Sequence, residues 1–87
     1  MFQLEIRKNA IKFLKSRSQK DRERVFTVLD KLVLNPFDKT LDIKPLVNCR
    51  YLRLRVNNYR IIYEILESKL IILILEIDNR GDVYKKL

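Results

Sequence analysis

The spacing of apolar residues changes within the first fifteen positions of the chain. Positions 2, 4 and 6 are apolar, and positions 3, 5 and 7 are polar. Because successive side chains of a strand point to opposite faces, this period of two predicts a strand with one buried face. After residue 9, Ala10, Phe13 and Leu14 follow the longer spacing of a helix. We therefore expect a short helix directly after the first strand.

A second, longer helix is predicted to begin at Ser18 and to end before Asn35-Pro36. Ser18 stands three residues before Asp21, and at this spacing a serine hydroxyl accepts a hydrogen bond from a free amide of the first turn. Pro36 lacks the amide that would continue the helix. The two helices should form a hairpin. The apolar stripe of the second helix consists of Val25, Phe26, Val28, Leu29, Leu32 and Val33.

Residues 35–48 contain several residues that interrupt regular structure. Pro36, Asp38, Asp42 and Pro45 argue against a helix or a strand in this segment. We expect a loop that packs onto the core through its apolar side chains, which are Phe37, Leu41, Ile43 and Leu46.

Three further strands are predicted over residues 50–56, 59–66 and 70–77, with turns at residues 57–58 and near residues 67–69. A chain of 87 residues has room for a single domain, residues 1–87. The element order is therefore β-α-α-β-β-β. It predicts an α+β fold in which a helical hairpin packs on one face of a mostly antiparallel four-stranded sheet.

A two-residue turn at Asn57-Asn58 determines which side chains share a face of the sheet. It places Arg55 opposite Arg60. One face is then expected against the helices and consists of Leu52, Leu54, Val56, Tyr59, Ile61 and Tyr63. The other face is expected toward solvent and consists of Tyr51, Arg53, Arg55, Arg60, Ile62 and Glu64.

The three arginines on the expected solvent face allow two interpretations. Arginines on an exposed sheet face often serve only solubility and edge protection. Like charges directly opposite each other nevertheless destabilise a sheet, unless an anion lies between them. Guanidinium groups bind phosphate bidentately, and an aromatic ring such as that of Tyr51 can stack on an unpaired base. Single-stranded RNA is therefore a ligand that fits this face.

The composition narrows the range of partners and compartments. Lys and Arg number 19 and Asp and Glu number 11, which gives a net charge of +8 and favours a polyanion or an acidic protein as partner. The single Cys49 cannot form an internal disulfide, so we expect it to be a small buried residue in a cytoplasmic protein. No apolar run approaches the ~20 residues of a membrane span. We expect no membrane partner, no metal and no cofactor, because the sequence contains no spacing of residues typical of such sites.

Two segments of the chain together resemble the RelE/ParE superfamily of bacterial and archaeal toxins. They are YLRLRVNNYRIIYEI at residues 51–65 and EIDNRGDVY at residues 76–84. The sequences NPFD at residues 35–38 and KPL at residues 44–46 are similar to that family's linker between helix and sheet. With the predicted element order, the likeness covers essentially the whole chain.

Resemblance to the RelE branch implies a toxin of a type II toxin–antitoxin system. Such a toxin inhibits translation as a metal-independent endoribonuclease that cleaves mRNA on the ribosome, and an acidic cognate antitoxin holds it inactive. The family's arginine that stabilises the scissile phosphate corresponds to Arg60, and a basic residue of the preceding strand corresponds to Arg53. The basic residue and tyrosine near the end correspond to Arg80 and Tyr84. The expected RNA contacts are Tyr51, Arg55 and Lys44.

Two departures from the family pattern leave the general base and acid open. Tyr51 stands where some members have lysine, and Asn79 stands where many have histidine. RNA can be cut by its own 2′-hydroxyl, so arginines would stabilise charge while Tyr84 would either move a proton or stack on a base. The resemblance also admits a ParE-like toxin that poisons DNA gyrase, or a homologue that only binds its antitoxin.

Overall fold

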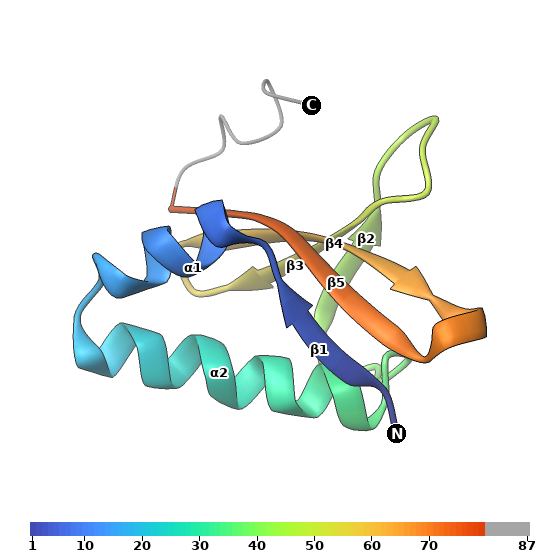
Figure 1. Cartoon of the computed structure of the whole chain (residues 1–87), viewed down its shortest axis with the longest axis horizontal. Coiled ribbons are helices and arrows are strands. Elements are labelled where there is room, and N and C mark those ends of the chain that lie inside the picture. The colour runs from blue at the N-terminus through green and yellow to red at the C-terminus, as the bar shows by residue number, and fades with distance from the viewer. Residues whose placement is uncertain (80–87) are drawn as a thin grey trace.

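The expected order of elements is present, with one strand added between the second helix and the predicted hairpin. The computed structural model describes residues 1–79, and Figure 1 shows the arrangement of its elements. The α+β class is confirmed. The elements are β1 (Gln3–Ile6), α1 (Lys8–Lys15), α2 (Gln19–Leu34), β2 (Asp42–Pro45), β3 (Leu52–Val56), β4 (Tyr59–Leu66), a 3₁₀ turn (Glu67–Lys69) and β5 (Ile71–Asp78).

The limits of α2 follow from the residues at its two ends. The Ser18 hydroxyl accepts a hydrogen bond of 3.2 Å from the Asp21 amide, as its spacing predicts, and so satisfies one of the amides that a helix leaves free in its first turn. At the other end Asn35 is extended, with a ψ of 96°, and Pro36 follows. The buried face is narrower than predicted, because Val25, Leu29 and Leu32 are buried whereas Phe26 is exposed.

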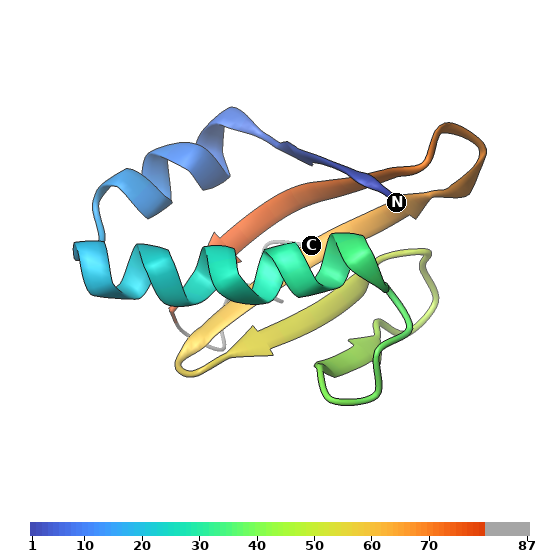
Figure 2. The ribbon, with the colours of Figure 1, turned by 90° about the horizontal axis from the view of Figure 1, so that it is seen from below.

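The sheet has the strand order β1-β5-β4-β3-β2. β1 runs parallel to β5, and the other pairs are antiparallel. Both helices lie on the same face of this sheet, as Figure 2 shows from the helical side. The opposite face, which we call the outer face, carries no helix from residues 1–79.

The sheet has five strands, so the prediction of four strands was wrong. The additional strand is β2, which lies within the segment 35–48 that was expected to be an irregular loop. Residues 42–45 alternate polar and apolar, and they pair with β3, with Ile43 opposite Leu54 and Lys44 opposite Arg53. Pro45 is tolerated because it is the last residue of an edge strand, where no ladder amide is needed. Because the segment contains two prolines, the sequence does not predict this strand. The strand is stabilised by its pairing with β3.

A bulge in β5 determines which of its side chains reach the core. Ile62 of β4 is paired with Glu76 and the next residue, Tyr63, is paired with Ile74, so Leu75 has no partner opposite it. The extra residue reverses the alternation of side chains beyond it. Ile77 consequently lies in the core with Ile74, whereas Glu76 and Asp78 lie on the outer face.

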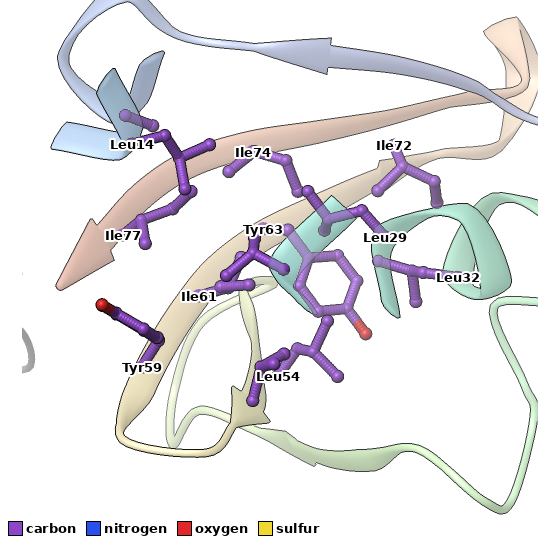
Figure 3. Packing of buried hydrophobic residues seen from close by; sticks show 13 residues of the cluster. Leu14, Leu29, Leu32, Leu54, Tyr59, Ile61, Tyr63, Ile72, Ile74 and Ile77 are labelled. Carbon is purple, nitrogen blue, oxygen red and sulfur yellow. The ribbon is translucent and has the colours of Figure 1, made fainter. Parts of the chain in front are cut away.

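The core lies between the two helices and the inner face of β3, β4 and β5 (Figure 3). All five predicted inner-face residues from Leu54 to Tyr63 belong to it. Within residues 1–79 the hydroxyl of Tyr63, which is 0% exposed, has no hydrogen-bond partner. The buried cluster consists of Ala10, Leu14, Val25, Leu29, Leu32, Leu54, Val56, Tyr59, Ile61, Tyr63, Ile72, Ile74 and Ile77.

Cys49 is exposed, so its expected burial was wrong. It lies in the loop between β2 and β3, which projects away from the sheet in Figure 1. The neighbouring Asn48 has a positive φ of 60°, a conformation that asparagine tolerates better than most residues. None of the helices within residues 1–79 is both long and apolar enough to cross a membrane.

Candidate functional site

The predicted hairpin register brings Arg55 and Arg60 together on the outer face. Val56 is paired with Tyr59 and Arg55 with Arg60, so Asn57 and Asn58 form the turn as expected. Asn57 has a φ of 53°, which explains why asparagine is suitable at the first turn position. The two arginines therefore extend from neighbouring strands at the turn end of the sheet.

A hollow of about 320 Å³ lies at these two arginines, and we call it the arginine hollow. None of the residues within 1–79 that line it is acidic, and they are Arg55, Asn57, Asn58, Arg60 and Asn79. Arg55 is exposed and Arg60 is half-buried. The Nε atom of Arg60 is buried and has no hydrogen-bond partner among residues 1–79. A buried guanidinium N–H without an acceptor is a group that an incoming anion would satisfy.

Acidic residues border this region on β2, on β5 and farther along β4, and Asp42 of β2 is paired in register with Arg55. Asp78 is paired in register with Arg60, and Glu76 is paired with Ile62. Glu64 forms an ion pair of 2.8 Å with Arg50. Positive charge is therefore concentrated on β3 and β4 near the turn, whereas negative charge lies on both adjacent strands, β2 and β5.

Arg53 does not lie on an open surface as the register argument predicted. It is only 6% exposed, and its guanidinium donates a hydrogen bond of 2.9 Å to Oδ1 of Asp42. The unpredicted strand β2 explains this burial, because it covers the edge of β3 and places Asp42 diagonally across from Arg53. A buried charge needs a partner of this kind to offset its loss of water. The role of Asp42 was not predicted from the sequence, where its only sign was the alternation of residues 42–45.

The remaining predicted site residues are more scattered. Lys44 is exposed and lies opposite Arg53 in the β2–β3 register, so both belong to the outer face. Tyr51 is half-buried just before β3, and the Arg50 guanidinium lies 5.9 Å from its ring centre. Arg80 and Tyr84 lie outside the described residues. The structure thus brings together Arg55 and Arg60, and places Arg53 farther along β3 with Lys44 opposite it on β2.

A second hollow lies on the other side of the same turn, with a volume of about 470 Å³. We call it the asparagine hollow, because three of its lining residues are asparagines. Its lining residues are Asp21, Arg24, Asn57, Asn58, Tyr59 and Asn79. The asparagines line both hollows, so the two adjoin at the turn.

Tyr59 joins the turn to the start of α2. Its hydroxyl donates a hydrogen bond of 2.6 Å to Oδ2 of Asp21, and its ring meets the edge of Phe13 at a centroid distance of 5.9 Å. Burial, and then the adjacent Asp21 carboxylate, raise the pKa of Tyr59. The phenol therefore stays protonated at neutral pH and holds the hairpin against the helix.

Within residues 1–79, no group of three His, Cys, Asp or Glu side chains is placed to hold a metal ion. The chemical groups concentrated around the turn are guanidinium and amide groups. They can bind and orient an anion and can stabilise negative charge that develops on it.

Comparisons with known proteins agree on one family. The family model for the ParE toxin of type II toxin–antitoxin systems, parDE, matches residues 4–84. The archaeal RelE–RelB complex from Pyrococcus horikoshii OT3 contains a chain that is similar to this one, with 26% identity and a TM-score of 0.81 over 92% of this chain and 96% of that chain. No curated protein sequence matches the chain.

Two further complexes contain chains of the same fold. The RelB–RelE antitoxin–toxin complex from Methanococcus jannaschii gives 25% identity and a TM-score of 0.75, covering 95% of this chain and 98% of that chain. The intact E. coli RelBE toxin–antitoxin complex gives 15% identity and a TM-score of 0.74, covering 88% and 94%. At 15% identity the likeness concerns the fold alone.

Proposed function

Because the chain belongs to the ParE toxin family of type II toxin–antitoxin systems, within the RelE/ParE superfamily, we propose that it arrests growth by cleaving mRNA on the ribosome. The proposed activity is that of a metal-independent endoribonuclease in the cytoplasm. Its substrate is a single-stranded message, which the ribosome holds extended.

The observation that carries this proposal is the arginine hollow. Arg55 and Arg60 face each other across two strands, and the lining of the hollow by the described part of the chain includes no carboxylate. The buried Nε of Arg60 lacks an acceptor among residues 1–79. A phosphodiester would supply acceptor oxygens to both guanidinium groups and would offset the repulsion between them.

The proposed reaction uses the substrate's own nucleophile. The ribose 2′-oxygen attacks the adjacent phosphorus, the bond to the 5′-oxygen of the next nucleotide breaks, and a 2′,3′-cyclic phosphate forms. The proton of the 2′-hydroxyl must be removed and the leaving oxygen must receive one. Arg60 stabilises the charge on the five-coordinate phosphorus, and Arg55 holds the phosphate in position. An arginine suits this task because it stays protonated at neutral pH.

The other expected site residues have more limited or separate roles in this proposal. Arg53 adds positive charge near the hollow, although its ion pair with Asp42 reduces its effect. Lys44 and Tyr51 would guide the RNA across the outer face beyond Arg53. Arg80 is proposed to assist the leaving group and Tyr84 to move a proton or stack on a base.

Ribosome dependence follows from the lack of a strong general base. The chain contains no histidine, the residue that titrates most readily near neutral pH. A site that supplies mainly charge stabilisation works best on a substrate that is already aligned for in-line attack. The translating ribosome can provide this alignment, so free RNA should be a poor substrate.

The proposed partner in the cell is an acidic antitoxin. The chain carries a net charge of +8, and the similar archaeal RelE was solved as a complex with RelB. Carboxylates of the antitoxin would approach the arginine hollow and compete there with phosphate. An apolar segment of the antitoxin would add affinity that salt does not weaken.

A purified translation system tests the proposal. Primer extension on a message should reveal cuts only when ribosomes translate it, and the upstream fragments should end in a 2′,3′-cyclic phosphate or a 3′-phosphate. An intact message in the presence of ribosomes would contradict the nuclease. Efficient cutting of free RNA would retain the nuclease but refute its dependence on the ribosome.

A second candidate is a gyrase poison, which the ParE description of the matching family favours. Such a toxin would need no phosphate-binding arginines on its outer face. Measuring gyrase-linked DNA breaks in the same cells separates the two candidates. Breaks that accumulate while messages stay intact would replace the nuclease with the poison.

A further inference from the structure

Four charged residues form a row across the outer face of the sheet. Asp42 of β2 is paired in register with Arg55 of β3. Arg55 is paired with Arg60 of β4, which in turn is paired with Asp78 of β5. Partners in register share a face of the sheet. The two arginines of the arginine hollow therefore have a carboxylate on the strand to each side of them.

The Asp42 carboxylate already binds a guanidinium group on this face. Its Oδ1 accepts a hydrogen bond of 2.9 Å from Arg53. Arg53 and Arg55 are two residues apart on β3, which is roughly 6.7 Å along a strand. Neighbouring phosphates of an extended single strand are a similar distance apart. An RNA strand that runs along β3 with one phosphate in the arginine hollow would therefore bring the next phosphate to Arg53, where it meets Asp42.

The two members of this ion pair differ in their contact with water. The Arg53 side chain is 8% exposed, whereas the Asp42 side chain is 51% exposed. The Nε atom of Arg53 is buried and has no acceptor among residues 1–79, so the pair leaves a donor of this guanidinium unsatisfied. Water can hydrate Asp42 when it turns away, but it cannot reach Arg53 as easily. An incoming phosphate would thus replace Asp42 and leave Arg53 in place.

The fold allows this exchange at little cost. Asp42 is the first residue of β2, which is an edge strand of the described sheet. Ile43, the next residue, packs against the core and holds the strand. A rotation of the Asp42 side chain leaves the pairing of β2 with β3 unchanged, because that pairing is made by the backbone.

We propose that Asp42 is an internal competitor for RNA phosphate, which occupies Arg53 in the free protein and is displaced when RNA binds. This inference rests on the proposed nuclease function and adds a form of regulation to its site. A single phosphate ion in the arginine hollow leaves the ion pair intact. A strand with two neighbouring phosphates reaches both places, so the competitor makes the site select a nucleic-acid chain over free phosphate.

The affinity for an RNA analogue tests the inference without any cleavage. The probe is a labelled tetranucleotide with 2′-deoxyribose at every position, and its binding is measured by fluorescence anisotropy at low salt. Asp42→Asn removes the charge and keeps an oxygen that accepts from Arg53, so the fold is retained. This variant should bind the probe about fivefold more tightly than the wild-type protein.

Glu64→Gln is the matched control. It removes the same charge from the same face of the sheet and breaks an ion pair with Arg50, but it leaves Asp42 on Arg53. Its affinity should change by less than about twofold. An equal gain in the two variants, or no binding of the probe by either the wild-type protein or Asp42→Asn, would overturn the inference.

A double-mutant cycle separates competition from a general effect of charge. In the Arg53→Met background, Asp42→Asn should change the affinity by less than about twofold, because no Arg53 is left to be released. A fivefold gain that persists without Arg53 would show that Asp42 acts through its charge alone, and would overturn the inference. Melting temperatures check that all four proteins of the cycle are folded.

NMR of the arginine Nε–H groups detects the displacement directly. The Nε atoms of Arg53 and Arg60 are buried, so their hydrogens exchange slowly with water and give observable signals. Both signals should shift when the tetranucleotide binds, whereas inorganic phosphate should shift only the Arg60 signal. A tetranucleotide that shifts the Arg60 signal and leaves the Arg53 signal in place would overturn the inference.

The outcomes separate this inference from the nuclease. Cleavage of mRNA on ribosomes, combined with an affinity for the probe that Asp42→Asn does not change, would refute the competitor and leave the nuclease intact. Displacement of Asp42 by the probe without cleavage of any message would confirm the competitor in an RNA-binding site and refute the nuclease.

Discussion

The Tyr59 hydroxyl donates a hydrogen bond of 2.6 Å to the Asp21 carboxylate and so connects the β3–β4 turn with the first turn of α2. These residues are 38 positions apart in sequence. The bond fixes the turn, and with it both hollows, against a helix whose start is set separately by Ser18.

We expect Tyr59→Phe to lower the free energy of unfolding by about 1–2 kcal/mol, because it removes a hydrogen bond to a charged acceptor and leaves the ring in place. Urea denaturation measures the effect. Tyr51→Phe is the matched control, since the Tyr51 hydroxyl makes no hydrogen bond within residues 1–79. Equal losses in the two variants would show that the bond to Asp21 contributes little.

Tyr63→Phe should stabilise the protein by about 1 kcal/mol at neutral pH. The Tyr63 hydroxyl is buried without a partner among residues 1–79, and burial of an unsatisfied polar group costs free energy. Thermal and urea denaturation of both proteins at pH 7 measure the change. A loss of stability would mean that a group outside this part of the chain satisfies the hydroxyl.

The same tyrosine should make stability depend on alkaline pH. Burial raises the pKa of Tyr63 from 10.0 to about 12. Between these values the unfolded chain releases the proton while the folded chain retains it, so the free energy of unfolding should fall as the pH rises. The wild-type protein should lose about 2–3 kcal/mol more than Tyr63→Phe between pH 10 and pH 12. Parallel curves for the two proteins over this range would contradict the assignment.

Arg60→Ala should reduce mRNA cleavage by about 10²–10³-fold, the usual loss when one charge-stabilising group is removed. Its melting temperature should stay near that of the wild-type protein, because the Arg60 side chain forms no ion pair or hydrogen bond within residues 1–79. Arg7→Ala removes the same charge from an exposed arginine that lines neither hollow, and it should cleave normally. Collapse of the Arg60→Ala fold would make the activity loss uninformative about catalysis and refute the expected stability.

Asp42→Ala should destabilise the fold by about 1–2 kcal/mol. The substitution leaves the Arg53 charge buried without its partner, although the 51% exposure of the Asp42 side chain lets water replace part of the contact. The double variant Asp42→Ala/Arg53→Met should recover much of this loss, because it removes the uncompensated charge.

Arg50→Ala is the control for this ion pair. It breaks the pair with Glu64, in which the Arg50 side chain is 75% exposed, and it should cost less than about 0.5 kcal/mol. If Asp42→Ala is as mild as Arg50→Ala, the buried pair contributes no more than a surface pair.

The parts of the fold that the sequence predicts depend on interactions between near neighbours. The Ser18 cap needs only the amide three residues on, and the turn at Asn57-Asn58 sets the β3–β4 register directly. Alternation within residues 51–63 then predicts the inner face, and it places Arg55 beside Arg60.

The features that the sequence analysis missed depend on segments that meet only in three dimensions. β2 is too short and too rich in proline to be recognised alone, and it forms because β3 offers a free edge. The burial of Arg53 follows from that strand, as does its pairing with Asp42. The bulge at Leu75 likewise appears only once β5 pairs with β4.

The parallel pairing of β1 with β5 has a consequence for synthesis of the chain. Asn9 and Leu75, which are 66 residues apart, are joined by a hydrogen bond next to this pairing, and β5 separates β1 from the rest of the sheet. β1 therefore cannot pair until β5 has been synthesised, and contacts of such long range form late in folding. A nascent chain cannot complete this sheet before β5 emerges from the ribosome, so β1 has no partner strand while the helices and the β3–β4 hairpin are already made.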